Sequence, residues 1–243
     1  MEDPARLAGL LNNFTALPGH KVLVHGGGRR ATKVAAALGI ETQMVQGRRI
    51  TNAEMLEVVT MVYAGLVNKN IVAQLQARQI NAIGLTGADL DVMLSHKRPP
   101  KNGVDYGFVG DVDEVSCKWL DTLIKAGAVP VMAPLTHNGH GTLLNTNADT
   151  IAAETAKAMA NLYEVTLVYC FEKPGVLAQA DNDNSVIARI TRQEFEKLSE
   201  KGIIQGGMLP KIQNALNAVD QGVARVVITQ ATDLKGEHGT LII

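Results

Sequence analysis

The sequence is poor in cysteine and aromatic residues and has no excess of charge of either sign. Its two cysteines, Cys117 and Cys170, lie in segments that read as a helix and a buried strand, and no signal peptide is recognisable. These features argue against a disulfide scaffold, and we expect a reducing, cytoplasmic location. The formal net charge is −1, and the lysines and arginines are scattered without aromatic partners. This pattern argues against nucleic-acid binding.

Long apolar runs are also missing, because the longest are only the length of a strand. The sequence therefore predicts no membrane span. With 243 residues the chain can bury a good core, as one large domain or two small ones. No long polar linker divides it, so we expect a single domain over residues 1–243.

Three consecutive glycines at residues 26–28 follow a short apolar run at residues 22–24. The run reads as a buried strand and residues 31–38 read as a helix, so the glycines lie at a strand-to-helix turn. Glycine lets the backbone come close to a ligand, and the first N–H groups of a helix are unpaired. The turn therefore favours an anion site, although a tight turn without a ligand would use the same residues.

Further strands and helices alternate along the chain. The predicted strands cover residues 80–85, 128–133, 165–171, 225–229 and, at an edge, 239–243; the predicted helices cover residues 5–14, 118–126, 150–160 and about 208–221. Two more helices open with capping boxes, Thr51-x-x-Glu54 and Thr191-x-x-Glu194, and residues 104–115 read as a glycine-interrupted flap. This alternation predicts an α/β fold, a three-layer αβα sandwich with a mostly parallel central sheet.

Polar and charged residues gather at the starts of two predicted helices. Asn145, Asn147 and Asp149 precede the helix at residues 150–160. Asn147 or Asp149 could simply cap that helix, but three short polar residues also suit a ligand site. Lys211 lies at the start of a later helix, where a cation is unfavourable unless an anion lies between it and the helix dipole. A bound phosphate and a solvated surface lysine are the two interpretations.

Other kinds of site fit the sequence less well. The Gly-x-Gly-x-x-Gly spacing of dinucleotide-binding oxidoreductases fails after Gly28, and the Walker lysine pattern is absent. A stretch beginning at Asp181 resembles a calcium loop but carries Val186 in place of the required glycine. His137 and His140 have no cysteine or acidic cluster beside them, so no metal site is predicted.

Five motifs, taken together, resemble the acetylglutamate kinases of the amino acid kinase family. They are His25-Gly-Gly-Gly28, Gly47-Arg-Arg49-Ile-Thr51, Gly107-Phe-Val-Gly110, Asn145-Thr-Asn-Ala-Asp149 and Gly206-Gly-Met-Leu-Pro-Lys211, in order along the chain. The resemblance implies a three-layer αβα enzyme, usually a homodimer or a dimer-based hexamer. Such an enzyme phosphorylates the side-chain carboxylate of an N-acylated glutamate with MgATP in arginine biosynthesis. It also implies an acylglutamate-binding half at about residues 1–160 and a nucleotide-binding half at about residues 161–243.

The same resemblance implies which residues bind the acylglutamate. Gly27 and Gly28 would offer backbone N–H groups to the substrate and to the transferring phosphoryl group. Arg49 would pair with the α-carboxylate, a bidentate task that suits a guanidinium group. Asn145 would hydrogen-bond the same amino acid.

Catalytic and nucleotide-binding roles follow in the same way. Lys211 would neutralise charge in the transition state, and Asp149 would hold that lysine in place. The nucleotide side would consist of Glu172, Gly175, Leu177, Gln205 and Gly207, and Mg²⁺ would be held through the phosphates. The side-chain carboxylate of glutamate has a pKa of about 4.3, so it is already ionised at neutral pH and requires no general base. Positioning and charge stabilisation then suffice for phosphoryl transfer.

The chain departs from the family pattern at its start. Members of the family begin with a strand that carries a Lys-x-Gly-Gly motif, whereas this sequence begins with Met1-Glu-Asp-Pro4 and a helix. We therefore expect a truncated or misassigned start, with one core strand and one of two catalytic lysines missing. Loss of one such charge would lower kcat by about 10²–10³. The chain would then be inactive or feeble, or a non-catalytic ligand-binding member of the fold.

Two further departures bear on the ligands. Glu172 follows Phe171, where the family more often has aspartate after a small hydroxyl residue. Arg48 stands where the family usually has an apolar residue near the acyl pocket. Arg48 either forms a surface or interface salt bridge or reads a second carboxylate, which would make N-succinylglutamate the better substrate. A related carbamate or amino acid kinase is the nearest alternative within the family.

Overall fold

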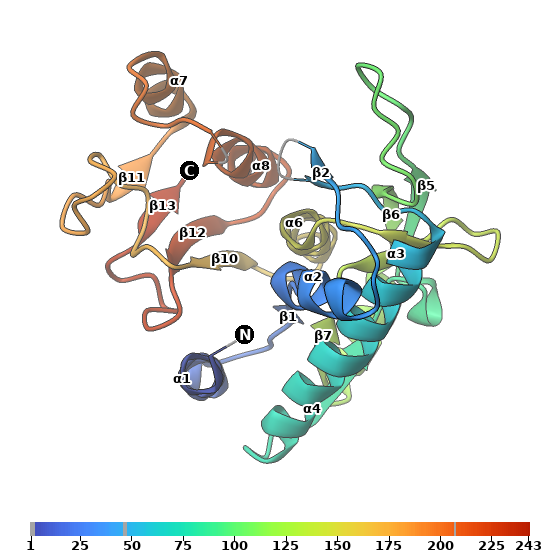
Figure 1. The fold of residues 1–243 in the computed structure, drawn as a ribbon. Coiled ribbons are helices and arrows are strands. Elements are labelled where there is room, and N and C mark those ends of the chain that lie inside the picture. Colours follow the sequence, from blue (N-terminus) through green and yellow to red (C-terminus); the bar gives the residue numbers. More distant parts are fainter. Residues whose placement is uncertain (1–2, 46–47, 207) are drawn as a thin grey trace. The chain divides into compact units, whose positions relative to one another are not determined.

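The computed structural model describes residues 3–45, 48–206 and 208–243, which form two compact units. The first unit comprises Gly19–Ile151, and the second comprises Asp3–Pro18 and Ala152–Ile243 (Figure 1). Helix α6 (Ala148–Met159) begins in the first unit and continues into the second. The division of labour between halves at about residue 160 stays a prediction.

The first unit is built on a parallel three-stranded sheet with the order β1-β7-β4. Its strands are β1 (Leu23–Val24), β7 (Val129–Met132) and β4 (Ala82–Leu85). Helix α4 (Asn68–Gln76) packs on β4 and β7, and α5 (Cys117–Lys125) packs on β7. The glycine turn lies between β1 and α2 (Gly28–Ala37), as predicted.

Smaller β structures complete the first unit. A hairpin joins β2 (Met44–Val45) to β3 (Arg48–Arg49). A four-stranded sheet has the order β6-β5-β8-β9, with β5 (Met93–Lys97), β6 (Gly110–Val115), β8 (Leu135–His137) and β9 (Leu143–Asn145), and a 3₁₀ turn, η2 (Asp89–Asp91), precedes β5. Strand β5 was not predicted, because its residues Met-Leu-Ser-His-Lys do not alternate cleanly between apolar and polar.

A continuous helical stretch follows β3 and changes its winding in the middle. It consists of α3 (Ala53–Val59), the π-helix η1 (Thr60–Val67) and α4. Its residues Met55, Val58 and Ile71 are buried. By length and composition the stretch could cross a membrane, but buried core helices of other proteins pass the same test. The absence of a membrane span therefore stays a prediction.

The predicted capping box of this helix is wrong. The N-cap is Asn52, whose side chain accepts a hydrogen bond from the N–H of Met55 at 2.9 Å. Thr51 is fully buried, and its hydroxyl accepts from the side chain of Asn145 at 2.9 Å. Because that hydroxyl is already engaged, the helix begins one residue later.

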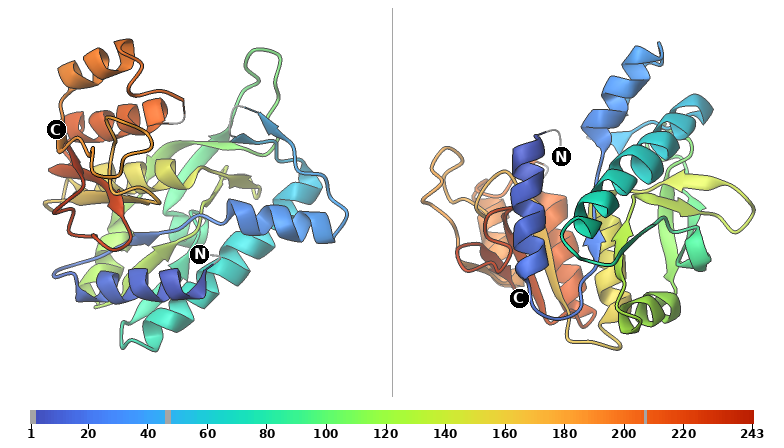
Figure 2. Two further views of the ribbon diagram at one scale, coloured as in Figure 1. Left: turned by 60° about the vertical axis from the view of Figure 1, so that its left-hand side comes forward. Right: turned by 90° about the horizontal axis from the view of Figure 1, so that it is seen from below.

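The second unit contains a four-stranded sheet with the order β10-β12-β13-β11. Its elements are α1 (Pro4–Ala16), β10 (Thr166–Phe171), β11 (Arg189–Ile190), α7 (Arg192–Glu200), α8 (Met208–Asp220), β12 (Arg225–Gln230) and β13 (Thr240–Ile242). Helix α8 packs on β12 and β13, and α1 lies on the opposite side of the sheet (Figures 1 and 2). The capping box at Thr191 and Glu194 is confirmed.

Within the two central sheets, the described pairings are parallel except for β12 with β13. The predicted α/β fold with a mostly parallel central sheet is therefore confirmed. The prediction of an edge strand at residues 239–243 is wrong, because β13 lies between β12 and β11. Strand β11 was missed because it is only two residues long, too short for an alternating pattern to be visible.

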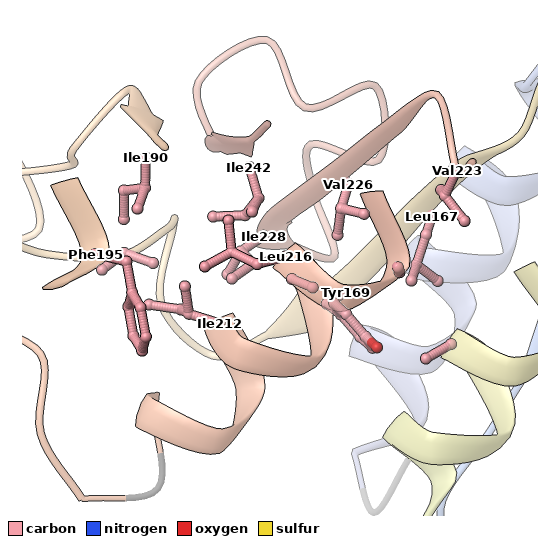
Figure 3. Packing of buried hydrophobic residues seen from close by; sticks show 14 of the residues in the cluster. Leu167, Tyr169, Ile190, Phe195, Ile212, Leu216, Val223, Val226, Ile228 and Ile242 are labelled. Atoms are coloured by element: carbon pink, nitrogen blue, oxygen red, sulfur yellow. The ribbon is translucent and has the colours of Figure 1, made fainter. Parts of the chain in front are cut away.

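The core of the second unit fills the space between the sheet and helices α7 and α8. Figure 3 shows the side chains that point toward one another there: Leu167, Tyr169, Ile190, Phe195, Ile212, Leu216, Val223, Val226, Ile228 and Ile242. All of them are buried. Helix α8 contributes through Ile212 and Leu216, which are four residues apart and so share one helix face. This packing holds in place the helix whose first turn contains Lys211.

We predict that Leu216→Ala destabilises the protein by about 2–5 kcal/mol, because it removes buried methyl groups and leaves a cavity. Urea unfolding followed by circular dichroism measures the loss. Asn217→Ala, at an exposed position of the same helix, is the matched control and should change stability by less than about 0.5 kcal/mol. Equal effects of the two substitutions would contradict the packing described above.

Candidate functional site

The glycine turn of the first unit allows a very close approach of the π-helix. A Cβ atom on Gly27 would lie 2.7 Å from Cδ1 of Tyr63 and 3.6 Å from Cγ2 of Val67. Only glycine leaves room for these side chains. Within the described part of the chain, the N–H groups of Gly27 and Gly28 meet no acceptor, as expected at the start of a helix. The geometry suits an anion bound at the N-terminus of α2.

Arg49 reaches this turn from strand β3. Its side chain is buried, with 8% of the residue exposed. Nη2 donates to the carbonyl oxygen of Gly28 at 2.9 Å and to Oγ1 of Thr32 at 2.8 Å, and Nη1 donates to Oγ1 of Thr42 at 3.1 Å. Side chains alternate along a strand, so Arg49 points inward while Arg48 is exposed.

The phenol of Tyr63 is a further hydrogen-bond partner of the Arg49 side chain. Burial raises the pKa of the Tyr63 phenol, and the charge and hydrogen bond of Arg49 partly offset that rise. The phenol therefore stays neutral and can accept a hydrogen bond from the guanidinium group. Tyr63 was not predicted to belong to the site, because a single tyrosine in an apolar helix carries no sequence signal of its own.

Among the described residues, the charge of Arg49 has neutral partners only. Its hydrogen bonds go to a carbonyl, to hydroxyls and to the sulfur of Met55, and no carboxylate in residues 3–45, 48–206 and 208–243 pairs with it. A buried cation without a counter-charge is unfavourable. An anionic ligand bound beside the glycine turn would supply the missing charge, and guanidinium binds carboxylate in a bidentate manner.

Asn145 approaches from the end of strand β9. Its side-chain amide donates to Oγ1 of Thr51, and its backbone N–H donates to the carbonyl oxygen of Phe108 at 2.8 Å. The N–H of Phe108 in turn donates to the carbonyl oxygen of Thr51 at 2.7 Å. At Gly107, with φ of 72°, a Cβ atom would lie 2.2 Å from that same oxygen, so glycine is required there. The predicted motifs at residues 51, 107–110 and 145 thus converge.

Arg48 lies beside a charged pair on the neighbouring sheet. Arg98 forms a bidentate hydrogen-bonded ion pair with Asp111, which lowers the pKa of that carboxyl group. The charge of Arg48 contributes a smaller part of the same shift. No ion pair of Arg48 itself is found in the described residues, and both interpretations of this arginine stay predictions.

Two predicted site residues lie at the starts of helices α6 and α8. Asp149 is in the first turn of α6, and the side chain of Asn147 caps that helix by accepting from the N–H of Asp149 at 2.8 Å. In the second unit, Lys211 is half-buried in the first turn of α8. Its Nζ lies 3.7 Å from the centre of the Phe171 ring, a close cation–π contact. Phe171 was noted in the sequence only as a departure from a family pattern.

The predicted nucleotide residues lie around the ends of strands in the second unit. Glu172 follows β10 and is exposed, and Gln205 is exposed in the turn before α8. Gly175 is packed so closely that a Cβ atom would lie 2.8 Å from Oγ1 of Thr240. Leu177 forms an isolated β-bridge with Val186. Gly207 lies outside the described residues, as does Gly47 of the arginine motif.

Comparisons with known proteins identify relatives along the whole chain. Residues 1–230 of this chain match the amino acid kinase family. The acetylglutamate kinase of Bacteroides thetaiotaomicron is 64% identical over 242 residues, which cover 100% of this chain and 94% of that protein.

Two solved structures are also similar. A protein of Streptococcus mutans UA159 has a TM-score of 0.81 at 26% identity, over 97% of this chain and 90% of that one. The carbamate kinase of Giardia lamblia, bound to AMP-PNP, has a TM-score of 0.67 at 15% identity, over 98% and 88%. The second likeness shows the fold alone.

We predict that a small dicarboxylate such as glutarate raises the midpoint of thermal unfolding of this protein through Arg49. A ligand that binds only the folded state raises the free energy of unfolding. Each kcal/mol gained raises the unfolding midpoint of a protein of this size by ~2–4 °C. Arg49→Met should abolish the shift, whereas Arg30→Met, at an exposed position on α2, should retain it. A shift that survives Arg49→Met would show that the anion binds elsewhere.

Proposed function

Because this chain belongs to the amino acid kinase family, we propose that it phosphorylates the γ-carboxylate of N-acetyl-L-glutamate with ATP, a step of arginine biosynthesis. The observation that carries the proposal is the buried charge of Arg49, which lies beside the glycine turn and has only neutral partners in the described part of the chain. The relative at 64% identity, an acetylglutamate kinase, supports the same reaction.

The first unit binds the acylglutamate in this proposal. Arg49 pairs with the α-carboxylate and gains the counter-charge that its present partners do not supply. Asn145 orients the same amino acid through its side-chain amide. The N–H groups of Gly27 and Gly28 face the γ-carboxylate and the phosphoryl group that it receives.

Charge stabilisation performs the chemistry. The γ-carboxylate is already an anion and attacks the γ-phosphorus of ATP directly; the bond from that phosphorus to the bridging oxygen breaks, and ADP leaves. No proton transfer is needed. Lys211 neutralises the charge that develops on the transferring group, and Asp149 positions Lys211. Mg²⁺ enters with ATP, held through the phosphates.

The nucleotide binds to the second unit in the same proposal. Its contacts are Glu172, Gly175, Leu177, Gln205 and Gly207. Phe171 holds Lys211 by the cation–π contact, and ATP phosphates would compete for the same ammonium group. We further propose a cytoplasmic homodimer; Met61 and Leu66, exposed on the π-helix, are available for the contact between subunits. A non-catalytic binding protein of this fold, or a related carbamate or amino acid kinase, remains the competing proposal.

The test of the reaction is formation of an acyl phosphate, trapped as the hydroxamate, from MgATP and N-acetyl-L-glutamate. Lys211→Met should lower kcat by about 10²–10³, because it removes a preorganised charge from the transition state. Lys201→Met, at an exposed position after α7, is the matched control and should leave kcat unchanged.

A second arm separates a feeble enzyme from a non-catalytic protein. The assay is repeated on a chain carrying an added Lys-x-Gly-Gly strand ahead of residue 1. Turnover in either chain supports the kinase, and turnover only in the extended chain supports the expected need for a second lysine. ATP and acylglutamate binding without turnover in both would refute the kinase and favour the binding protein.

The acyl group is tested separately at Arg48. We propose that its exposed side chain, without an ion pair among the described residues, reads the second carboxylate of N-succinyl-L-glutamate. Arg48→Leu should then lower kcat/KM for the succinyl substrate by about 10-fold or more while changing that for the acetyl substrate little. Arg29→Leu, an exposed arginine of α2, is the control. Equal efficiency with both substrates before and after Arg48→Leu would rule out this role.

A further inference from the structure

A buried histidine stands directly before the glycine turn. Only 4% of His25 is exposed, although histidine carries two polar ring nitrogens. Both nitrogens have partners: Nδ1 lies 2.8 Å from the carbonyl oxygen of Gly26, and Nε2 lies 3.1 Å from Nδ2 of Asn68. Asn68 is also buried, and its Nδ2 donates to the carbonyl oxygen of Val131 on β7 at 2.9 Å.

The proton positions in this row of hydrogen bonds follow from the two backbone carbonyl groups at its ends, those of Gly26 and Val131. A backbone carbonyl can only accept, so the atom of Asn68 that faces Val131 must be the NH₂ group. The second proton of that NH₂ group then points at Nε2 of His25, which must accept it. Nδ1 therefore carries the ring proton and donates it to the carbonyl oxygen of Gly26. A proton added at Nε2 would face the protons of Asn68, and burial also lowers the pKa of the ring.

This hydrogen bond fixes the plane of the peptide between Gly26 and Gly27. The peptide is planar and trans, so its C=O and N–H groups point in opposite directions. Because the carbonyl oxygen is held by His25, the N–H of Gly27 must point away from His25. Glycine alone could not hold that orientation, since its backbone rotates with little steric restriction.

The side chain of Asn68 also has an unfavourable feature, which concerns its oxygen atom. Its Oδ1 is buried and has no hydrogen-bond partner among the residues that the structure describes. It also fills the place of a side chain on β4, because a Cβ atom on Gly84 would lie 1.7 Å from it. Rotating the amide would bring two oxygens together at Val131. An unsatisfied buried acceptor is unfavourable, so stability alone does not explain this residue.

We propose that His25, held by Asn68 as the Nδ1–H tautomer, is a positioning residue that aims the N–H of Gly27 at the transferring phosphoryl group. The kinetic part of this inference rests on the proposed kinase reaction. The tautomer does not, because it follows from the hydrogen-bond chain alone.

The first test is spectroscopic. Long-range ¹H–¹⁵N correlation on protein with ¹⁵N-labelled histidine distinguishes a protonated from a bare ring nitrogen, and His25→Asn identifies the signal among the six histidines. We expect His25 to have its proton on Nδ1, and we expect its lowered pKa to keep the ring neutral at a pH where an isolated imidazole is protonated. A proton on Nε2 would overturn the proposal whether or not the protein is active.

The second test compares two amides at position 25. The amide of asparagine reaches the place of Nδ1 and can still donate to Gly26, whereas that of glutamine reaches the place of Nε2 and meets only Asn68. We expect His25→Gln to lower kcat about 10²-fold with little change in KM for ATP, as a misplaced donor does. His25→Asn should recover most of that loss.

Thermal unfolding of both variants provides the control for a purely structural role. If kcat followed the loss of stability in both variants, His25 would only be packing the core, and the proposal would be wrong. If the unaltered chain showed no turnover, the proposed reaction would fail while the tautomer would still be decided by the spectrum.

Discussion

The hydrogen bond from the guanidinium group of Arg49 to the carbonyl oxygen of Gly28 is the contact around which the first unit is arranged. It requires a strand that delivers a buried arginine, a turn without side chains, and a helix that leaves its first N–H groups unpaired. Each of these elements is unfavourable alone, since burying a charge and using glycine both reduce stability. Together they place a buried positive charge beside a helix N-terminus, the arrangement on which the proposed anion site rests.

The π-helix explains how one helix contacts the glycine turn and the residue before it at several points. In η1, Tyr63 and Val67 both approach Gly27, and Asn68 follows at once to meet His25. A regular α-helix turns 100° per residue and would carry Asn68 farther from Tyr63 around the helix; the wider turn keeps them near one face. π-Helical turns are rare in proteins, but many of those known lie at functional sites. This one brings a phenol, a methyl group and an amide together around the glycine turn.

Much of the architecture was visible in the sequence because long elements carry strong patterns. The glycine turn was predicted from a strand-to-helix pattern, whereas Arg49 and Asn145 were proposed as site residues through the resemblance to a family. The contributions of Tyr63, Asn68 and Phe171 were not predicted, because each depends on which element packs beside it and not on its neighbours in the chain. The N-cap at Asn52 was missed for the same reason: the hydroxyl of Thr51 is taken by Asn145, 94 residues away. Local rules fail where a distant residue competes for the same atom.

The close fit between Gly84 and the side-chain oxygen of Asn68 constrains how this sequence can change. A side chain cannot be added at position 84 while Asn68 is present, and Asn68 cannot be replaced without leaving Nε2 of His25 unpaired. A library that varies positions 68 and 84 one at a time will therefore find both of them restrictive. Combined replacement opens packing solutions that no single step can reach, because the oxygen of Asn68 occupies the space that a side chain at position 84 would need.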